Sequence, residues 1–268
     1  MKKNLKITNI LTFDLEEWFH ILELPDPVKR SEWSSLPSSA EVGLDLFLEL
    51  LYRNNITCTF FVLGWIADKH PNLVRRISSL NHEVASHGYL HESIRNIKAD
   101  RFREDIRRSK RLLEDITGKE VKGYRGPGFS ITLKNPWALE IIAEEGFEYD
   151  ATLYPGHHGH GGIPGLPIKP FILHTNNGYR IEEYPVTLIN IAKYRIAFSG
   201  GGYFRLFPSF FTSRCFRWLN RRGIPVLSYF HARDLDPTSP ALSMPLFRKF
   251  KCYVNVSSSI KKLEKLFK

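Results

Sequence analysis

Strand-like and helix-like segments alternate along most of this 268-residue chain. Short runs of apolar and β-branched residues predict strands, and apolar residues three or four positions apart predict helices. The predicted strands cover residues 10–13, 57–63, 82–86, 121–124, 147–152, 180–186 and 226–231, and the predicted helices cover residues 41–54, 66–80, 100–117, 136–145 and 208–222. A repeated strand-then-helix order is typical of a mainly parallel sheet or a closed α/β barrel, and about seven strands favour the barrel.

Three further predictions complete this organisation. Asn135 is suited to be the N-cap of the helix over residues 136–145, with Pro136 in its first turn. Residues 155–179 are rich in Gly, Pro and His and predict a long loop. The lysine-rich tail, residues 257–268, has apolar residues along one helical face. We expect this tail to pack on the domain, with a membrane surface as the alternative.

The composition favours a folded protein with anionic partners. Hydrophobic residues make up 43% of the chain, and Lys and Arg outnumber Asp and Glu by 38 to 28, which gives a net charge of +10 at pH 7. This charge favours acidic glycans, phospholipid surfaces or nucleic acid as partners. The basic residues are dispersed, and no RNP-like motif or zinc-finger spacing accompanies them, so we predict no nucleic-acid partner.

Cysteine usage and the N-terminal sequence predict a cytoplasmic protein. The three cysteines, Cys58, Cys215 and Cys252, are far apart and imply no disulfide framework, which suits a reducing compartment. The basic N-terminus precedes an apolar stretch that is too short and too polar for a signal peptide, and no later run reaches membrane-spanning length. Peripheral contact with the inner membrane face is an additional hypothesis.

Two carboxylates follow the first predicted strand. Asp14 and Glu16 are two residues apart, so in extended backbone their side chains point to the same side. Two acids at one strand end repel each other and lose hydration, which is costly unless a cation or a proton lies between them. Taken alone, the segment fits an acidic loop equally well.

A histidine pair, His87 and His91, starts at the end of another predicted strand. On one helical turn, an i, i+4 pair directs both imidazoles toward one point, as a divalent metal requires. With a carboxylate from the first strand, the pair supplies two nitrogens and one oxygen, a common ligand set of an open catalytic zinc site. The alternative is one capping and one surface histidine.

Further candidates lie near the ends of predicted strands, where the catalytic groups of α/β barrels project. Arg125 stands in a turn in which two glycines surround a proline, and it can hold a carboxylate bidentately. A structural turn with a surface arginine is the alternative. His231 ends the last predicted strand and could donate a proton to a leaving group, a role that needs a group other than the base. Asp150 also lies at a strand end.

Together these residues resemble the motifs of the NodB-homology polysaccharide deacetylases, carbohydrate esterase family 4. Five segments carry the resemblance, in the family's order: Thr12-Phe13-Asp14 with Glu16, His87 with His91, Arg125 with Pro127, residues 149–155, and Tyr229-Phe230-His231. Tyr229 stands where the fifth motif of the family has Leu. The resemblance covers residues 10–235.

Three further segments, residues 14–20, 199–205 and 229–237, resemble one subfamily. Its members are the deacetylases encoded in exopolysaccharide and exosortase-type loci, and they have a short C-terminal extension. The chain departs from the family at its second acid. Many members have two adjacent aspartates, whereas here Glu16 follows Asp14 after an intervening Leu15. Glu17 is a competing candidate, and we choose Glu16 because it falls on the same side as Asp14.

The resemblance implies a distorted (β/α)7-type barrel, NodB-like and related to the TIM barrel, with a C-terminal helical extension. The catalytic domain would span residues 1–237 and the basic extension residues 238–268. The implied activity is metal-dependent removal of N-acetyl groups from an amino-sugar polysaccharide or its precursor. The implied site residues are Glu16, His87 and His91 as ligands of a divalent metal, expected to be zinc, Asp14 as base, Arg125 as its orienting partner, and His231 as acid.

The same resemblance suggests how substrate is bound. We predict substrate contacts from Pro127, Tyr203, Trp18 and Asp150, with a loop over residues 200–205 shaping the sugar groove. Tyr203 and Trp18 would stack on pyranose rings or, alternatively, lie in the core. Asp150 or Asp234 would set the tautomer of His231.

The expected partner is an N-acetylated glycan or a lipid-linked oligosaccharide, with peripheral contact to an anionic membrane. Two rival functions stay open. The first is a metal-dependent hydrolase of a small amide or cyclic ureide on the same fold, and the second is a non-catalytic glycan-binding protein. Three histidines of the glycine-rich loop, His157, His158 and His160, either bind metal adventitiously or belong to a flexible loop.

Overall fold

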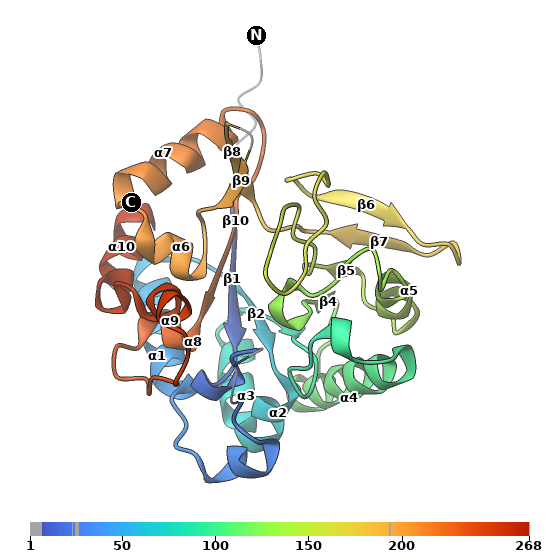
Figure 1. Ribbon diagram of the computed structural model, residues 1–268. Coiled ribbons are helices and arrows are strands. Elements are labelled where there is room, and N and C mark those ends of the chain that lie inside the picture. The colour runs from blue at the N-terminus through green and yellow to red at the C-terminus, as the bar shows by residue number, and fades with distance from the viewer. Residues whose placement is uncertain (1–6, 23, 25–26, 193, 268) are drawn as a thin grey trace.

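An eight-stranded sheet forms the centre of the computed structural model, which describes residues 7–22, 24, 27–192 and 194–267 (Figure 1). Its strand order is β10-β1-β2-β3-β4-β5-β7-β6. Within the described residues, the seven strands from β10 to β7 run parallel, and β6 pairs antiparallel with β7. The sheet curls into an open half-barrel with helices around it. The α/β fold of a distorted NodB-like barrel that the sequence predicted is therefore confirmed.

The strands are short, and most lie inside the predicted segments. The sheet contains β1 Ile10–Leu15, β2 Thr59–Val62, β3 Glu83–Ser86, β4 Gly123–Tyr124, β5 Tyr149–Asp150, β6 Phe171–His174, β7 Arg180–Glu183 and β10 Leu227–His231. A separate antiparallel hairpin consists of β8 Leu188–Ile191 and β9 Tyr194–Ala197.

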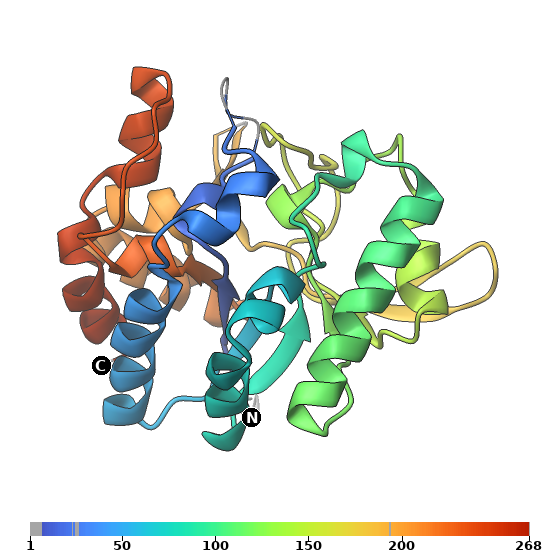
Figure 2. The ribbon, with the colours of Figure 1, turned by 90° about the horizontal axis from the view of Figure 1, so that it is seen from below.

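Helices surround the sheet (Figure 2). The α-helices are α1 Ala40–Asn54, α2 Gly64–Lys69, α3 Pro71–Ser79, α4 Ala99–Thr117, α5 Trp137–Glu144, α6 Gly201–Leu206, α7 Ser209–Asn220, α8 Ala232–Leu235, α9 Leu246–Tyr253 and α10 Ser259–Phe267. Short 3-10 helices are η1 Trp18–His20, η2 Arg30–Ser35, η3 Ile94–Asn96, η4 Pro127–Phe129 and η5 Val256–Ser258.

Aromatic packing between α1 and the sheet fixes the position of β1. The fully buried Phe13 of β1 stacks on Phe47 of α1, with ring centroids 4.7 Å apart, and contacts Phe60 of β2 at 5.4 Å. Each such buried side chain stabilises the fold by about 1.5–3 kcal/mol. On the other side of β1, the parallel register aligns Asp14 with His231. The core thus determines which side chains meet at the carboxyl end of the sheet.

Two predicted helix boundaries differ from the structure. The helix expected over residues 66–80 is divided into α2 and α3 at His70, which has φ −131° and ψ 58°. The residue before a proline is disfavoured in helical conformation, and Pro71 begins α3. Asn135 does not cap α5, because its Oδ1 accepts hydrogen bonds from the backbone N and the Oγ1 of Thr132.

Several elements occur where loops or no element were predicted. The expected loop over residues 155–179 contains β6, and residues 200–205, also expected to be a loop, belong mostly to α6. The β8–β9 hairpin and α9 were not predicted. The glycine run at residues 200–202 explains the error for α6, since glycine has a low helix propensity.

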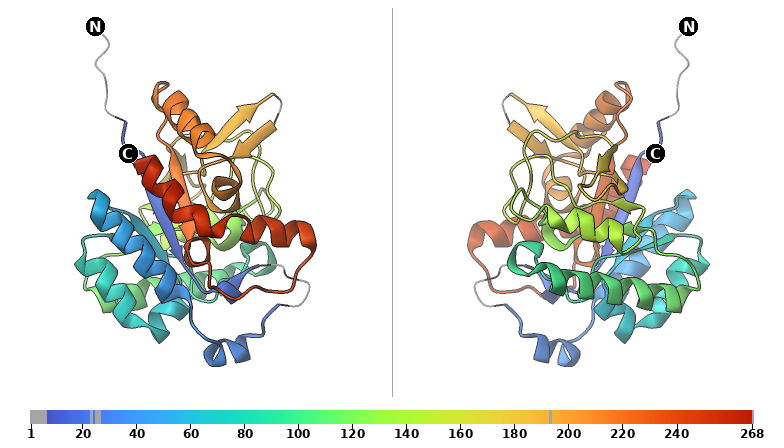
Figure 3. Two further views of the ribbon diagram at one scale, coloured as in Figure 1. Left: turned by 90° about the vertical axis from the view of Figure 1, so that its left-hand side faces the viewer. Right: turned by 90° about the vertical axis from the view of Figure 1, so that its right-hand side faces the viewer.

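Of the C-terminal helices, α9 packs against α6, and α10 packs against α1 and α7 (Figure 3). Leu263 of α10 has no exposed surface, and Ile260 and Leu266 pack partly buried against the core. The prediction that the tail packs on the domain is confirmed. Among the described residues, no helix is both long enough and apolar enough to span a bilayer.

Candidate metal-dependent active site

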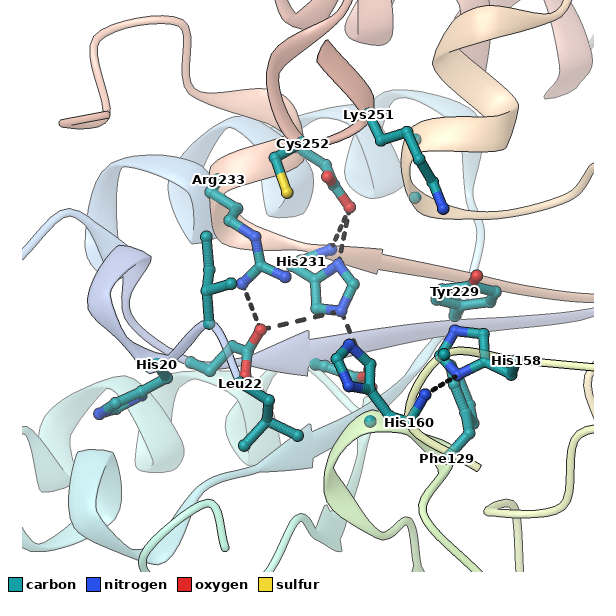
Figure 4. A pocket seen from close by; sticks show the side chains of 18 of the residues that line it. His20, Leu22, Phe129, His158, His160, Tyr229, His231, Arg233, Lys251 and Cys252 are labelled. Carbon is teal, nitrogen blue, oxygen red and sulfur yellow. Dashed lines mark hydrogen bonds and ion pairs between the residues drawn. The ribbon is translucent and has the colours of Figure 1, made fainter. Parts of the chain in front are cut away.

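A cavity of about 440 Å³ opens at the carboxyl ends of the parallel strands. Its walls come from the segments after β1, β3, β4 and β10, from the loop after β5, and from α6 and α9. His231 and Arg233 border it on one side, and His158 and His160 of the glycine-rich loop border it on the other (Figure 4). Segments far apart in the sequence therefore meet around one space.

Three predicted ligands converge in this cavity. A carboxylate oxygen of Glu16 and one ring nitrogen each of His87 and His91 all lie within 4.8 Å of one another. Glu16 Oε2 is 2.6 Å from His91 Nε2 and 4.0 Å from His87 Nε2. His87 Nδ1 donates a hydrogen bond of 2.7 Å to the carbonyl oxygen of Arg125, which leaves the lone pair of Nε2 facing the group.

The chemistry of this group suits a divalent cation. Glu16 Oε2 is buried and makes no hydrogen bond of normal geometry. Burial by itself would raise the pKa of Glu16, but the nearby His91 and Arg233 outweigh it and hold the pKa well below its usual value. A buried, ionised carboxylate beside two imidazole nitrogens is a ligand set that zinc and several other divalent metals accept.

The two histidines converge from a loop, which corrects the predicted helical turn. Residues 87–91 follow β3 without helical structure, and Gly88 and His91 have positive φ values of 72° and 52°. Asp105 of α4 shapes the loop by accepting hydrogen bonds from the backbone N of Tyr89 at 2.6 Å and of Leu90 at 3.0 Å. The sequence pattern identified the right pair but the wrong local geometry.

Glu16 and Glu17 point in different directions. Glu17 Oε2 accepts a hydrogen bond of 3.0 Å from the backbone N of Ser39, and its Oε1 accepts one from Ser38 Oγ. Glu17 thus bonds to the segment before α1, whereas Glu16 faces the histidines.

Asp14 is held by Arg125 beside this group. Arg125 Nη1 donates to Asp14 Oδ1 at 2.7 Å and to Thr12 Oγ1 at 2.8 Å, and its guanidinium lies 4.0 Å from the ring centroid of Phe61. The contact with Asp14 is through one nitrogen, not bidentate as the sequence suggested, and Arg125 Nη2 has no hydrogen-bond partner. Asp14 Oδ2 is left facing His231 Nε2 at 3.8 Å.

His231 is oriented by Asp234 rather than by Asp150. Its Nδ1 donates to Asp234 Oδ2 at 2.8 Å, and its backbone N donates to the same oxygen at 3.0 Å. Nε2 then lies 3.8 Å from both Asp14 Oδ2 and Glu16 Oε1. Burial and the nearby Arg233 lower the pKa of His231 to about 3, so the imidazole is neutral with its Nε2 lone pair toward the carboxylates.

Three of the four predicted substrate residues lie outside the cavity wall. Asp150 is fully buried and bonds to the backbone N and Oγ1 of Thr152, at 3.1 and 2.5 Å. Trp18 is 8% exposed and donates from its indole to the carbonyl oxygen of Pro37. Pro127 is buried in the turn after β4. Only Tyr203 contributes to the lining, so Trp18 belongs to the core alternative stated above.

Two residues that line the cavity and affect its chemistry were not predicted from the sequence. Arg233 forms an ion pair with Glu16 Oε1, and His20 packs its ring against His91 with centroids 5.7 Å apart. Burial strongly lowers the pKa of His20, whose Nδ1 accepts a hydrogen bond of 3.1 Å from the backbone N of Glu17. Arg233 could have been suspected, since it follows His231 by two positions and paired carboxylates attract a cation.

Two family models match this chain. One, described as polysaccharide deacetylase, matches residues 41–149, and the other, described as a domain of unknown function (DUF3473), matches residues 151–268. A peptidoglycan-N-acetylglucosamine deacetylase of Bacillus cereus is 34% identical over 95 residues, which are 35% of this chain and 34% of that protein. The chain thus spans about a third of the length of this relative.

Solved structures with the same fold cover nearly all of the chain. A putative polysaccharide deacetylase from Mycobacterium smegmatis has a TM-score of 0.63 and 23% identity, over 97% of this chain and 84% of that one. Puue allantoinase has a TM-score of 0.62 and 18% identity, over 99% of this chain and 84% of that one. At such identities, these likenesses support the fold, and the chemistry has to be argued from the residues of the cavity.

Proposed function

Because the chain carries a polysaccharide deacetylase domain of the NodB family, carbohydrate esterase family 4, we propose that it is a metal-dependent hydrolase of N-acetyl groups. Its substrate would be an amino-sugar-containing polysaccharide or the precursor of one. The observation that carries this proposal is the convergence of Glu16, His87 and His91 beside Asp14 and His231 in one cavity. The subfamily and the division into residues 1–237 and 238–268 stay predictions.

Glu16, His87 and His91 would hold the metal, with zinc as our assignment. When bound there, the cation would polarise the acetyl carbonyl and lower the pKa of a water molecule. The three side chains are kept in place by the protein itself: His87 by the carbonyl oxygen of Arg125, His91 by its packing against His20, and Glu16 by Arg233.

Asp14 and His231 would move the protons. Asp14 is the proposed general base, and Arg125 fixes its Oδ1 so that Oδ2 is available to take a proton from the attacking water. His231 Nε2 is unprotonated and 3.8 Å from that oxygen, so it can receive the proton from Asp14. Once protonated, His231 is the proposed acid that donates to the departing amine, while Asp234 bonds to Nδ1.

An acetate-release assay tests this function. We expect the protein reconstituted with zinc to release acetate from N-acetylglucosamine oligomers or from a lipid-linked precursor, and a chelator to stop the release. Allantoin and small amides serve as comparison substrates. Hydrolysis of these instead would support the cyclic-ureide or amide alternative, and glycan binding without any acetate release would support the non-catalytic one.

We also propose a cytoplasmic location with peripheral contact to an anionic membrane, through α9 rather than the tail helix. Leu246, Phe247 and Phe250 of α9 are 86%, 77% and 51% exposed, with Arg248 and Lys249 between them and Lys251 directly after them. This helix projects from the edge of the molecule next to the cavity (Figure 2). Apolar residues interspersed with cations suit a surface of anionic headgroups.

Co-sedimentation with phosphatidylserine-containing vesicles tests the membrane contact. Replacing Leu246 and Phe250 by Ser is expected to weaken vesicle affinity about 100-fold or more, because each of the two buried apolar side chains contributes about 1.5–3 kcal/mol and each 1.4 kcal/mol is tenfold. Tyr52→Ser, at a residue of α1 that is 85% exposed, is the matched control. Equal sedimentation of the α9 variant and the wild type would exclude α9 as the contact surface.

A further inference from the structure

The last turn of α9 binds a buried arginine of α6. Arg205 is 1% exposed, and its guanidinium donates from Nε to the carbonyl oxygen of Val254 at 2.9 Å. Its Nη2 donates to the carbonyl oxygens of Lys251 at 3.1 Å and Cys252 at 2.7 Å. Carbonyl groups at the end of a helix lack intrahelical partners and carry partial negative charge, so they suit a cation.

The remaining nitrogen of the same guanidinium binds Asp234, the residue that orients His231, the proposed general acid. Arg205 Nη1 forms a buried ion pair with Asp234 Oδ1, and the other oxygen of Asp234 accepts both hydrogen bonds from His231. The interactions run without a break from α9 through Arg205 and Asp234 to His231. We propose that the C-terminal segment completes the active site by fixing the orientation of His231 through Arg205, an inference that rests on the proposed function.

The glycine run before Arg205 explains how α6 reaches this position. A Cβ on Gly200 would lie 2.4 Å from the ring of Tyr229, and a Cβ on Gly202 would lie 2.3 Å from the carbonyl oxygen of Lys251. Gly201 has a positive φ of 49°. The three glycines therefore let α6 fit between β10 and α9, where Arg205 reaches Asp234 on one side and the α9 carbonyls on the other.

In a second set of contacts between α6 and the C-terminal segment, the C-terminal residues are the donors and the carbonyl groups at the end of α6 are the acceptors. Asn255 Nδ2 donates to the carbonyl oxygen of Arg205 at 3.3 Å, and Lys262 Nζ donates to the same oxygen and to that of Phe207 at 3.1 Å. The C-terminal segment thus binds both the side chain of Arg205 and the end of the helix that carries it. Arg205 is a positioning residue in this arrangement, and residues 246–262 support its position.

Full-length variants test the inference. Arg205→Met removes the guanidinium, and Gly202→Ala leaves it in place but forces α9 away from α6 without lowering helix propensity. We expect each to lower kcat by about 10- to 100-fold, the usual cost of losing an outer partner of an active-site group, with KM and zinc content little changed. Arg205→Lys keeps one charge on Asp234 and is expected to recover part of kcat. The exposed Arg221→Met is the matched control.

A double-mutant cycle separates positioning from general damage. If Arg205 acts through Asp234, the loss in Arg205→Met/Asp234→Asn will be no greater than in Asp234→Asn alone. The inference would be overturned if the kcat losses of the two single variants multiply in the double variant, or if Arg205→Met has the kcat of the wild type. If Arg205→Met does not fold, the cycle is measured with Arg205→Gln, which also removes the charge, and the same two results would overturn the inference.

A spectroscopic measurement keeps this test independent of the proposed activity. In metal-free protein labelled with 15N-histidine, the imidazole of His231, assigned with His231→Gln, is expected to show one tautomer protonated at Nδ1. Both Gly202→Ala and Arg205→Met should give a mixture of tautomers or a broadened signal, and an unchanged spectrum in both would contradict the inference. An absence of acetate release by the wild type would instead refute the proposed function and leave this result standing.

Discussion

Replacing Asp14 by Asn is expected to lower kcat for acetate release by about 10²- to 10⁴-fold, the usual contribution of a general base. The zinc content should stay near that of the wild type, because Asp14 is not one of the three residues whose ligand atoms converge. The amide keeps an oxygen that can accept the hydrogen bond from Arg125, so the side chain keeps its place while it loses the ability to take a proton.

This substitution removes the carboxylate that neutralises the buried charge of Arg125, which lowers the stability of the fold. That guanidinium keeps its bonds to Thr12 Oγ1 and to the carbonyl oxygen of Ala151, and its contact with the ring of Phe61. We therefore expect a folded protein with a lower melting temperature. Metal analysis of Asp14→Asn decides the role: loss of zinc together with activity would make Asp14 a ligand, whereas wild-type activity would exclude it as the base.

The parts of the site that lie at strand ends could be predicted from the sequence. Asp14 is the last residue but one of β1 and His231 is the last of β10, and parallel strands bring their carboxyl ends to one edge of the sheet. The β1–β10 register aligns these two residues directly. Strand periodicity and position are local properties, so they are visible in a single sequence.

The interactions that orient these residues could not be predicted, because their partners are distant or irregular. Arg205 contacts the carbonyl oxygens of residues 251, 252 and 254, and backbone acceptors leave no sign in a sequence. Asp105 shapes the loop of His87 and His91 from the middle of an amphipathic helix, where an acid is expected to face solvent. Asp150 was predicted to contact substrate because of its place at a strand end, yet it is fully buried and lies outside the cavity wall.

The buried pair of Asp150 and Glu183 illustrates a second reason for such errors. Burial raises the pKa of both carboxyl groups, and most strongly that of Glu183, whose Oε1 accepts a hydrogen bond from the backbone N of Leu153. Through their bonds to Thr152 and Leu153, these buried acids hold the loop after β5 in place. In the sequence, a structural acid of this kind and a catalytic acid look the same.

Replacing His91 by Ala is expected to remove bound zinc and activity together. A metal that acts as a Lewis acid contributes several kcal/mol to transition-state stabilisation, and each 1.36 kcal/mol is tenfold in rate, so the loss should be roughly 10³-fold or more. In the wild type, zinc at 100 times its Kd should stabilise the fold by about 2.7 kcal/mol, which raises the melting temperature by roughly 5–10 °C. His91→Ala and His87→Ala should lose this shift.

Matched variants make the result specific to the three proposed ligands. His174→Ala removes an exposed histidine of β6, at the far edge of the sheet, and should keep both the zinc-dependent shift and the activity. Glu17→Gln should also keep bound zinc, because an amide oxygen can still accept from the backbone N of Ser39, whereas Glu16→Gln should lose most of it. Stoichiometric zinc in both His87→Ala and His91→Ala would exclude the proposed site. If Glu17→Gln loses zinc while Glu16→Gln keeps it, the carboxylate ligand is Glu17 and not Glu16.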